Sequence, residues 1–173
     1  MIAGSKHGPG AWLFRILCAG VAAPIAANLA RLVYRTITGL PPVDWSITGR
    51  WFLMVLSGQP YAPGIGTAAP LPHELLVGTL GYHLISITFA AVYLIGLALI
   101  GRRETFANGL VFGWVTMAFP FLVQMPLMGL GVFASLTPTP WILLGRTLVH
   151  HTGFGLGLAL GAMLADAVLR RRK

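Results

Sequence analysis

The sequence has few charged side chains, very few acidic ones and a single cysteine. Charged residues make up 9% of the chain, and only four of its 173 residues are aspartate or glutamate. A soluble domain carries about 25% charged residues, so this composition excludes an ordinary soluble protein with a fully hydrated surface. Cys18 is the only cysteine, which excludes an intrachain disulfide.

The sequence also lacks the motifs that usually identify an enzyme. It contains no G-x-S-x-G elbow and no pair of neighbouring carboxylates that would act as acid and base. His83 with Ser86, and His150 with Thr147, are neighbours at helical spacing and nothing more. The sequence therefore does not predict an enzyme.

A basic excess is present, but its pattern does not indicate nucleic acid. The formal net charge is +8, which in a soluble protein would suggest a nucleic-acid partner. Most basic residues stand instead at the ends of apolar runs, and no stripe of alternating basic and aromatic residues is found. We therefore expect no nucleic-acid partner.

Long apolar runs are the dominant feature of the chain. Hydrophobic residues make up 56% of it, and the mean hydropathy is +0.79. A helix that crosses a bilayer needs about 20 mostly apolar residues. Four segments meet this requirement, at about 11–33, 76–100, 106–130 and 141–169.

One further apolar run, 51–56, is too short to cross. It follows Pro41-Pro42 and precedes a loop rich in glycine and proline, so we expect it to lie on the membrane interface or to re-enter it. The sequence thus predicts an all-α integral membrane protein. Residues 1–173 would form a single domain, a four-transmembrane-helix bundle with a short interfacial or re-entrant segment in its first outer loop.

Basic residues predict the orientation, because lysine and arginine are retained on the cytoplasmic side. With both termini inside, the cytoplasmic side holds Lys6, Arg15, Arg102, Arg103, Arg170, Arg171, Arg172 and Lys173. The outer side then holds only Arg31, Arg35 and Arg50, and Arg146 lies within the fourth span. We therefore expect both termini to be cytoplasmic.

Each span carries one stripe of polar or small residues at helical spacing. Helices in lipid associate through small residues and interhelical hydrogen bonds, so these stripes predict the faces that pack together. They comprise Gly20, Pro24, Asn28, Arg31 and Arg35; Thr79, His83, Ser86, Ala90 and Tyr93; Gly109, Gly113, Thr116, Pro120 and Gln124; and Arg146, His150, Gly153, Gly157 and Gly161. The polar members gather in the half of the bundle away from the termini.

The polar half of the interior is the predicted site. Ionisable groups inside a membrane usually face an interior or a water-filled cavity and often mark function. Arginine binds carboxylate and phosphate with two-pronged geometry, so a lipid headgroup, a quinone or a small anion is the expected ligand. The candidate residues are Asn28, Arg31, Arg50, His83, Gln124, Arg146, His150 and His151, with Arg50 and Arg146 holding the anion. Pro120 and Pro126 predict irregular backbone near Gln124 that lines this cavity.

Two alternatives stay open. His83 with His150 or His151 would supply two ligands from different helices to a haem or a metal ion, although no motif identifies the cofactor. The polar residues would otherwise only join helices, in an accessory subunit that binds no ligand and contacts another membrane protein or a second copy of the chain.

Short motifs in a fixed order run through most of the chain, from about Asn28 to Leu160. They are Gly39-Leu40-Pro41, Gly49-Arg50-Trp51, Pro72, Glu74, His83, Pro120-Phe121, Gln124, Pro126, Gly129, Gly131, Ala134-Ser135, Thr137-Pro138, Pro140, Arg146, His151, Phe154-Gly155 and Gly157-Leu158. Together they resemble a family of small bacterial multi-pass inner-membrane proteins of unknown function, domain-of-unknown-function family 2938. The resemblance implies a location in the bacterial inner membrane and no particular activity. It points to His151, whereas the helical spacing points to His150.

Overall fold

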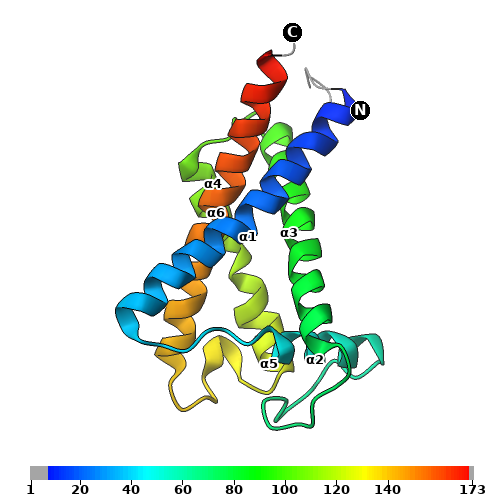
Figure 1. The fold of residues 1–173 in the computed structure, drawn as a ribbon, viewed down its shortest axis with the longest axis vertical. Coiled ribbons are helices and arrows are strands. Elements are labelled where there is room, and N and C mark those ends of the chain that lie inside the picture. The colour runs from blue at the N-terminus through cyan, green and yellow to red at the C-terminus, as the bar shows by residue number, and fades with distance from the viewer. Residues whose placement is uncertain (1–7, 172–173) are drawn as a thin grey trace.

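The computed structural model describes residues 8–171, and every regular element within that range is a helix (Figure 1). Its elements are α1 (Pro9–Thr38), α2 (Trp45–Leu56), α3 (Glu74–Leu99), α4 (Phe106–Thr116), a π-helix (Pro120–Gln124), α5 (Met125–Leu127), a 3-10 turn (Val132–Ala134) and α6 (Pro140–Arg171). Four segments are long and apolar enough to cross a membrane: Pro9–Thr38, Glu74–Leu99, Phe106–Leu127 and Pro140–Arg171. The predicted all-α fold with four membrane-length helices is confirmed.

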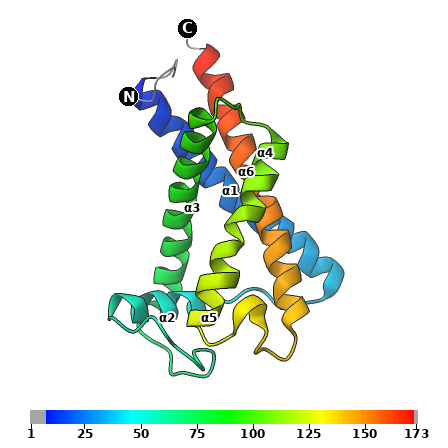
Figure 2. The ribbon, with the colours of Figure 1, turned by 180° about the vertical axis from the view of Figure 1, so that it is seen from behind.

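The described ends of the chain lie together at one end of the bundle (Figure 1). Figure 2 shows α2, α5 and the long loops gathered at the opposite end. Lys6, Arg172 and Lys173, which entered the predicted orientation, lie outside the described residues.

The close contact between α1 and α6 comes from the small residues of the fourth predicted stripe. A Cβ atom added at Gly153, Gly157 or Gly161 would lie within 2.8 Å of atoms of α1. Their neighbours on α1 are the backbone of Cys18 and several alanines, including Ala23 and Ala27, which are fully buried. Without side chains in the way, the two helices can touch through their backbones, as the stripe predicted.

The third span is interrupted where Pro120 enters it. Proline has no N–H to donate, and its ring clashes with the carbonyl of the preceding helical turn. The chain responds with a π-helical turn, in which the backbone N–H of Met125 donates to the carbonyl of Pro120. The predicted irregular backbone near Gln124 is confirmed.

The apolar core and the polar half of the bundle are at different levels. The main cluster joins α1, α3 and α6 through residues such as Ala23, Leu94 and Leu158, each fully buried. Phe112 of α4 closes this level against Phe89 and Tyr93, with ring centroids 6.4 and 5.2 Å away. From this level toward α2, side chains of α3 and of the interrupted third span line an open space.

Candidate functional site: two adjoining cavities at the α2 end

Two adjoining cavities lie at the end of the bundle away from the termini. The larger has a volume of about 450 Å³ and the smaller about 180 Å³. Pockets that hold small ligands range over roughly 300–1,000 Å³, so the larger cavity alone is of that size. Four residues line both cavities and form their common wall: Arg31, Pro42, Val43 and Arg146.

The larger cavity has mostly apolar walls with a few polar groups. Its apolar lining includes Phe52, Phe89, Phe119, Met125, Leu143 and Phe154. Gln124, from the π-helical turn, also lines it. Both histidines of the fourth span line it as well, so neither His150 nor His151 is excluded from the interior.

Aromatic rings form one side of the larger cavity. Trp45 stacks on Tyr82 with ring centroids 4.4 Å apart, and His150 lies 5.5 Å from Tyr82. The hydroxyl of Tyr82 and the Nδ1 atom of His150 are buried and have no hydrogen-bond partner in the described part of the chain. A buried polar atom without a partner is uncommon and calls for an explanation.

The neighbouring histidine is held differently. His151 Nδ1 lies 2.9 Å from the hydroxyl of Thr116, which itself donates to the carbonyl of Gly113 at 2.6 Å. Because that hydroxyl has a single hydrogen, His151 Nδ1 must be the donor to Thr116. Neutral His151 then has its acceptor lone pair on Nε2.

Arginines line the smaller cavity and the common wall. Arg31 donates to the side-chain oxygen of Asn28, and its guanidinium lies 5.0 Å from the ring centroid of Trp45. Arg146 Nη2 donates to the carbonyl of Pro41 at 3.0 Å. Arg35 also lines the smaller cavity, and its side chain is exposed.

No carboxylate pairs with these three arginines within residues 8–171. The chain has only four acidic residues, and none of them forms an ion pair with these arginines. Glu74 pairs with Arg50, while Glu104 and Asp166 both contact Arg15 near the other end of the bundle. Asp44 lines the larger cavity but accepts a 2.8 Å hydrogen bond from the backbone of Ser46, which caps α2. The common wall and the smaller cavity are therefore electropositive.

Two predicted site residues lie elsewhere. His83 is exposed on α3 and lines neither cavity, whereas the preceding residue, Tyr82, faces the larger one. Adjacent residues of a helix point about 100° apart, so the predicted stripe leaves the cavity side at His83, although its members Ser86, Ala90 and Tyr93 are buried. The alternative spacing Tyr82, Ser86, Ala90 and Tyr93, all buried, was already present in the sequence.

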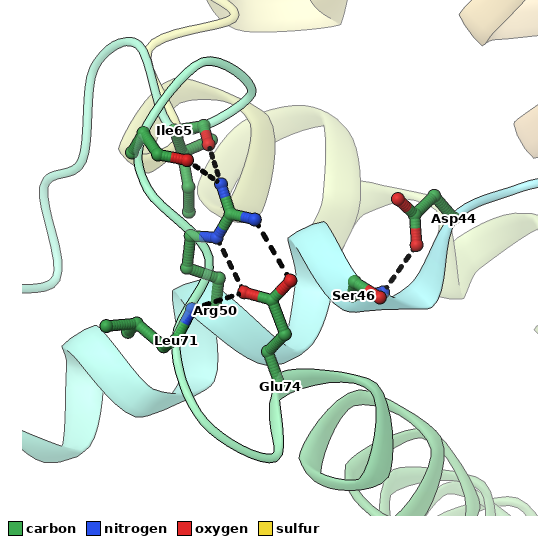
Figure 3. Close-up of polar contacts among 7 residues, drawn as sticks. Asp44, Ser46, Arg50, Ile65, Leu71 and Glu74 are labelled. Atoms are coloured by element: carbon green, nitrogen blue, oxygen red, sulfur yellow. Dashed lines mark hydrogen bonds and ion pairs between the residues drawn. The ribbon is translucent and has the colours of Figure 1, made fainter.

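Arg50, the other predicted residue, lines neither cavity, and Figure 3 shows its side chain facing Glu74 and the loop carbonyls. Its Nε and Nη2 atoms donate to Glu74 at 2.7 and 3.0 Å, and Nη1 donates to the carbonyls of Ile65 and Ala68. Glu74 also accepts from the backbone N–H of Leu71 at 2.9 Å. The hydrogen bonds to Glu74 raise the pKa of the Arg50 guanidinium. Arg50 thus fastens the loop between α2 and α3 and is not available to an external anion.

An Arg50→Lys variant tests this assignment. Lysine keeps the charge but cannot make the two-pronged contact with Glu74 while also reaching the loop carbonyls. We expect faster hydrogen exchange and faster proteolysis confined to residues 57–73, with the four long helices unaffected. If hydrogen exchange and proteolysis of this loop were unchanged and an anionic lipid bound more weakly, Arg50 would instead be part of the binding site.

The predicted two-histidine ligand set is not gathered in one cavity, because His83 lines neither of the two. His83 is exposed, and the rings of His150 and His151, 5.1 Å apart, belong to consecutive residues of one helix. Within residues 8–171 no cluster of three histidine, cysteine or acidic side chains could hold a metal ion.

One protein-family model matches residues 17–165, and its description reads "Protein of unknown function (DUF2938)". This match confirms the family resemblance noted from the sequence motifs. No curated protein and no solved structure matches the chain.

Proposed function

Since the chain belongs to the DUF2938 family of proteins of unknown function, which brings no activity with it, we propose a function from the geometry of the two cavities. The protein binds an amphiphile with an anionic head. The head occupies the smaller, arginine-lined cavity, and the apolar part occupies the larger one. A membrane lipid with a phosphate headgroup has this chemistry.

The observation that carries the proposal is that two arginines, Arg31 and Arg146, belong to the common wall between the cavities. Each lines an apolar chamber on one side and a basic chamber on the other. Neither has a carboxylate partner among the described side chains. Charged groups in an apolar environment are costly without a partner, and a phosphate bridging the two guanidinium groups would supply one.

The size and polarity of the cavities favour an amphiphile over the other predicted ligands. A quinone suits the larger cavity but brings no anion to the arginines. A small anion satisfies the arginines but leaves an apolar space of about 450 Å³ unfilled. The absence of a ligand, as in an accessory subunit, would leave both the larger cavity and the unpaired buried atoms of Tyr82 and His150 unexplained.

We further propose that the protein resides in a bacterial inner membrane with both termini in the cytoplasm. Arg15, Arg102, Arg103, Arg170 and Arg171 lie toward the termini, and the excess of basic residues at that end supports this orientation. The cavities then face the outer leaflet, and the ligand comes from that leaflet.

Replacing Arg146 with alanine tests the proposal. A charge-assisted hydrogen bond contributes about 1.5–3 kcal/mol, so we expect the dissociation constant for phosphatidylglycerol to rise at least tenfold. The measurement is native mass spectrometry or lipid titration of the purified full chain in a neutral detergent. Binding of diacylglycerol, which has the same acyl chains but no phosphate, provides the reference for the apolar contribution.

Arg102→Ala is the matched control, because it removes one charge from the exposed α3–α4 loop at the other end. It should leave lipid affinity unchanged. Arg35→Ala should weaken binding in the same direction as Arg146→Ala, since Arg35 lines the smaller cavity without bonding to the protein backbone. If Arg102→Ala and Arg146→Ala lost equal affinity for the lipid, the loss would come from the overall charge of the protein, which would contradict a defined site.

A further inference from the structure

We infer that the larger cavity recognises an ester carbonyl of the bound lipid through the Tyr82 hydroxyl and the Nδ1 atom of His150. The ligand class is thereby narrowed to ester-linked phospholipids. This inference rests on the proposed function, because it concerns the part of the same ligand that lies beyond its charged head.

The unpaired Tyr82 hydroxyl and His150 Nδ1 atom, together called the polar spot, belong to residues that line the mostly apolar larger cavity. Tyr82 is only 9% exposed, its hydroxyl is buried, and that hydroxyl has no partner among residues 8–171. His150 Nδ1 is in the same condition, and the two rings lie 5.5 Å apart. Both residues line the larger cavity. Burying a polar group without a hydrogen bond is unfavourable, so an occupant that bonds to this spot stabilises the site.

Three hydroxyl groups on the long helices that line this cavity are already engaged. Those of Ser86, Thr116 and Thr147 each donate to a backbone carbonyl of their own helix, at distances of 2.6–2.8 Å. Among the hydroxyl groups that α3, α4 and α6 place on the cavity, that of Tyr82 is therefore the donor left for an occupant. This hydroxyl requires an acceptor. A carbonyl oxygen has two lone pairs, so it can accept from the Tyr82 hydroxyl and also from the N–H of a neutral His150 whose hydrogen is on Nδ1.

The position of this spot relative to the arginines fits a phospholipid. His150 follows Arg146 by four residues on α6, so it lies about 6 Å further along the helix axis. On the facing side, Arg31 lies over Trp45, and Trp45 stacks on Tyr82. On each side of the cavity, a guanidinium group is thus followed by an unpaired polar atom: Arg146 by His150 Nδ1, and Arg31 by the Tyr82 hydroxyl. In a glycerophospholipid, the ester carbonyls follow the phosphate after a few covalent bonds, and the acyl chains follow the esters.

The test compares two lipids that differ only at these carbonyls. Ester-linked phosphatidylglycerol and its ether-linked analogue with the same chain lengths have the same charged head, but the ether form lacks both carbonyl oxygens. Their dissociation constants are measured for the purified full-length chain in neutral detergent. We expect the wild type to prefer the ester lipid by about tenfold, the effect of one well-formed hydrogen bond.

Tyr82→Phe should abolish most of this preference while leaving affinity for the ether lipid unchanged. The phenylalanine ring retains the stacking on Trp45, and thermal unfolding of the lipid-free variant should be no lower than that of the wild type because an unpaired buried hydroxyl has been removed. His150→Leu provides a second variant and should also reduce the preference. Arg146→Ala should weaken binding of both lipids by the same factor and keep the ester preference.

The outcomes separate this inference from the proposed function. If the wild type binds ester and ether lipids equally well but still depends on the charged head, the inferred contact with the ester carbonyl is overturned. The proposed site for the head is then unaffected. An ester preference that survives in both Tyr82→Phe and His150→Leu also overturns it, because the carbonyl would then be bound elsewhere and a water molecule would satisfy the two atoms. Loss of all dependence on the charged head overturns the proposed function itself.

Discussion

Replacing Arg15 with methionine is expected to destabilise the protein more than any other single change considered, by about 3–5 kcal/mol. The guanidinium of Arg15 lies between two carboxylates, contacting Glu104 and, at 2.7 Å from Nε, Asp166. The three side chains are only 6%, 14% and 18% exposed. Without the cation, two half-buried like charges remain side by side. The measurement is unfolding in detergent, followed by the loss of helical circular dichroism or of folded monomer on size exclusion.

Removing the stranded charges should reverse most of this loss. We expect the triple variant Arg15→Met, Glu104→Gln, Asp166→Asn to be markedly more stable than Arg15→Met, because no uncompensated charge is left in the cluster. Asp166→Asn alone should have a smaller effect than Arg15→Met, since Glu104 still pairs with the arginine. A triple variant as unstable as Arg15→Met would show that Arg15 acts through the packing of its alkyl chain.

A single methyl group at Gly157 is expected to have the second largest effect. Its Cβ would lie 2.7 Å from the carbonyl oxygen of Ala22 and 2.7 Å from the Cα atom of Ala23. Both are backbone atoms of α1 and cannot move aside without separating α1 from α6. We expect Gly157→Ala to lower the free energy of unfolding by about 1–3 kcal/mol, the usual effect of overpacking.

Gly96→Ala is the matched control, because an added Cβ at Gly96 would meet nothing within 4 Å. It should raise stability by up to about 1 kcal/mol, since alanine is the better helix former. The two variants are compared by thermal unfolding in the same detergent. A decrease of similar size in both would mean that the loss comes from glycine removal in general and not from the α1–α6 contact.

The sequence was sufficient to predict features that depend on local pattern. Apolar runs of sufficient length marked the four long helices, and the glycines of α6 marked its contact with α1. Pro120 marked the irregular turn beside Gln124. Each of these follows from a few neighbouring residues and one physical rule.

Features that depend on distant partners could not be predicted in the same way. Arg50 was assigned to the anion because nothing in its neighbourhood shows that the carbonyls of Ile65 and Ala68 surround it. The partners of Arg15 are 89 and 151 residues away. On α3, two adjacent positions gave equally regular stripes, and only packing against the other helices selects Tyr82 over His83.

If α1 and α6 cross a bilayer as proposed, their lengths indicate the depth of Arg31 and Arg146. Their 30 and 32 residues correspond to about 45 and 48 Å, which exceeds the roughly 30 Å hydrocarbon layer of a bilayer. When that excess is shared equally, about 8 Å of each helix end projects beyond the layer. Arg31 lies seven residues before the end of α1 and Arg146 six residues after the start of α6, so both lie about 9–11 Å from those ends. With the helices upright in the proposed bilayer, the two guanidinium groups would stand near the level of the lipid headgroups, and a lipid could reach them without leaving the plane of its own leaflet.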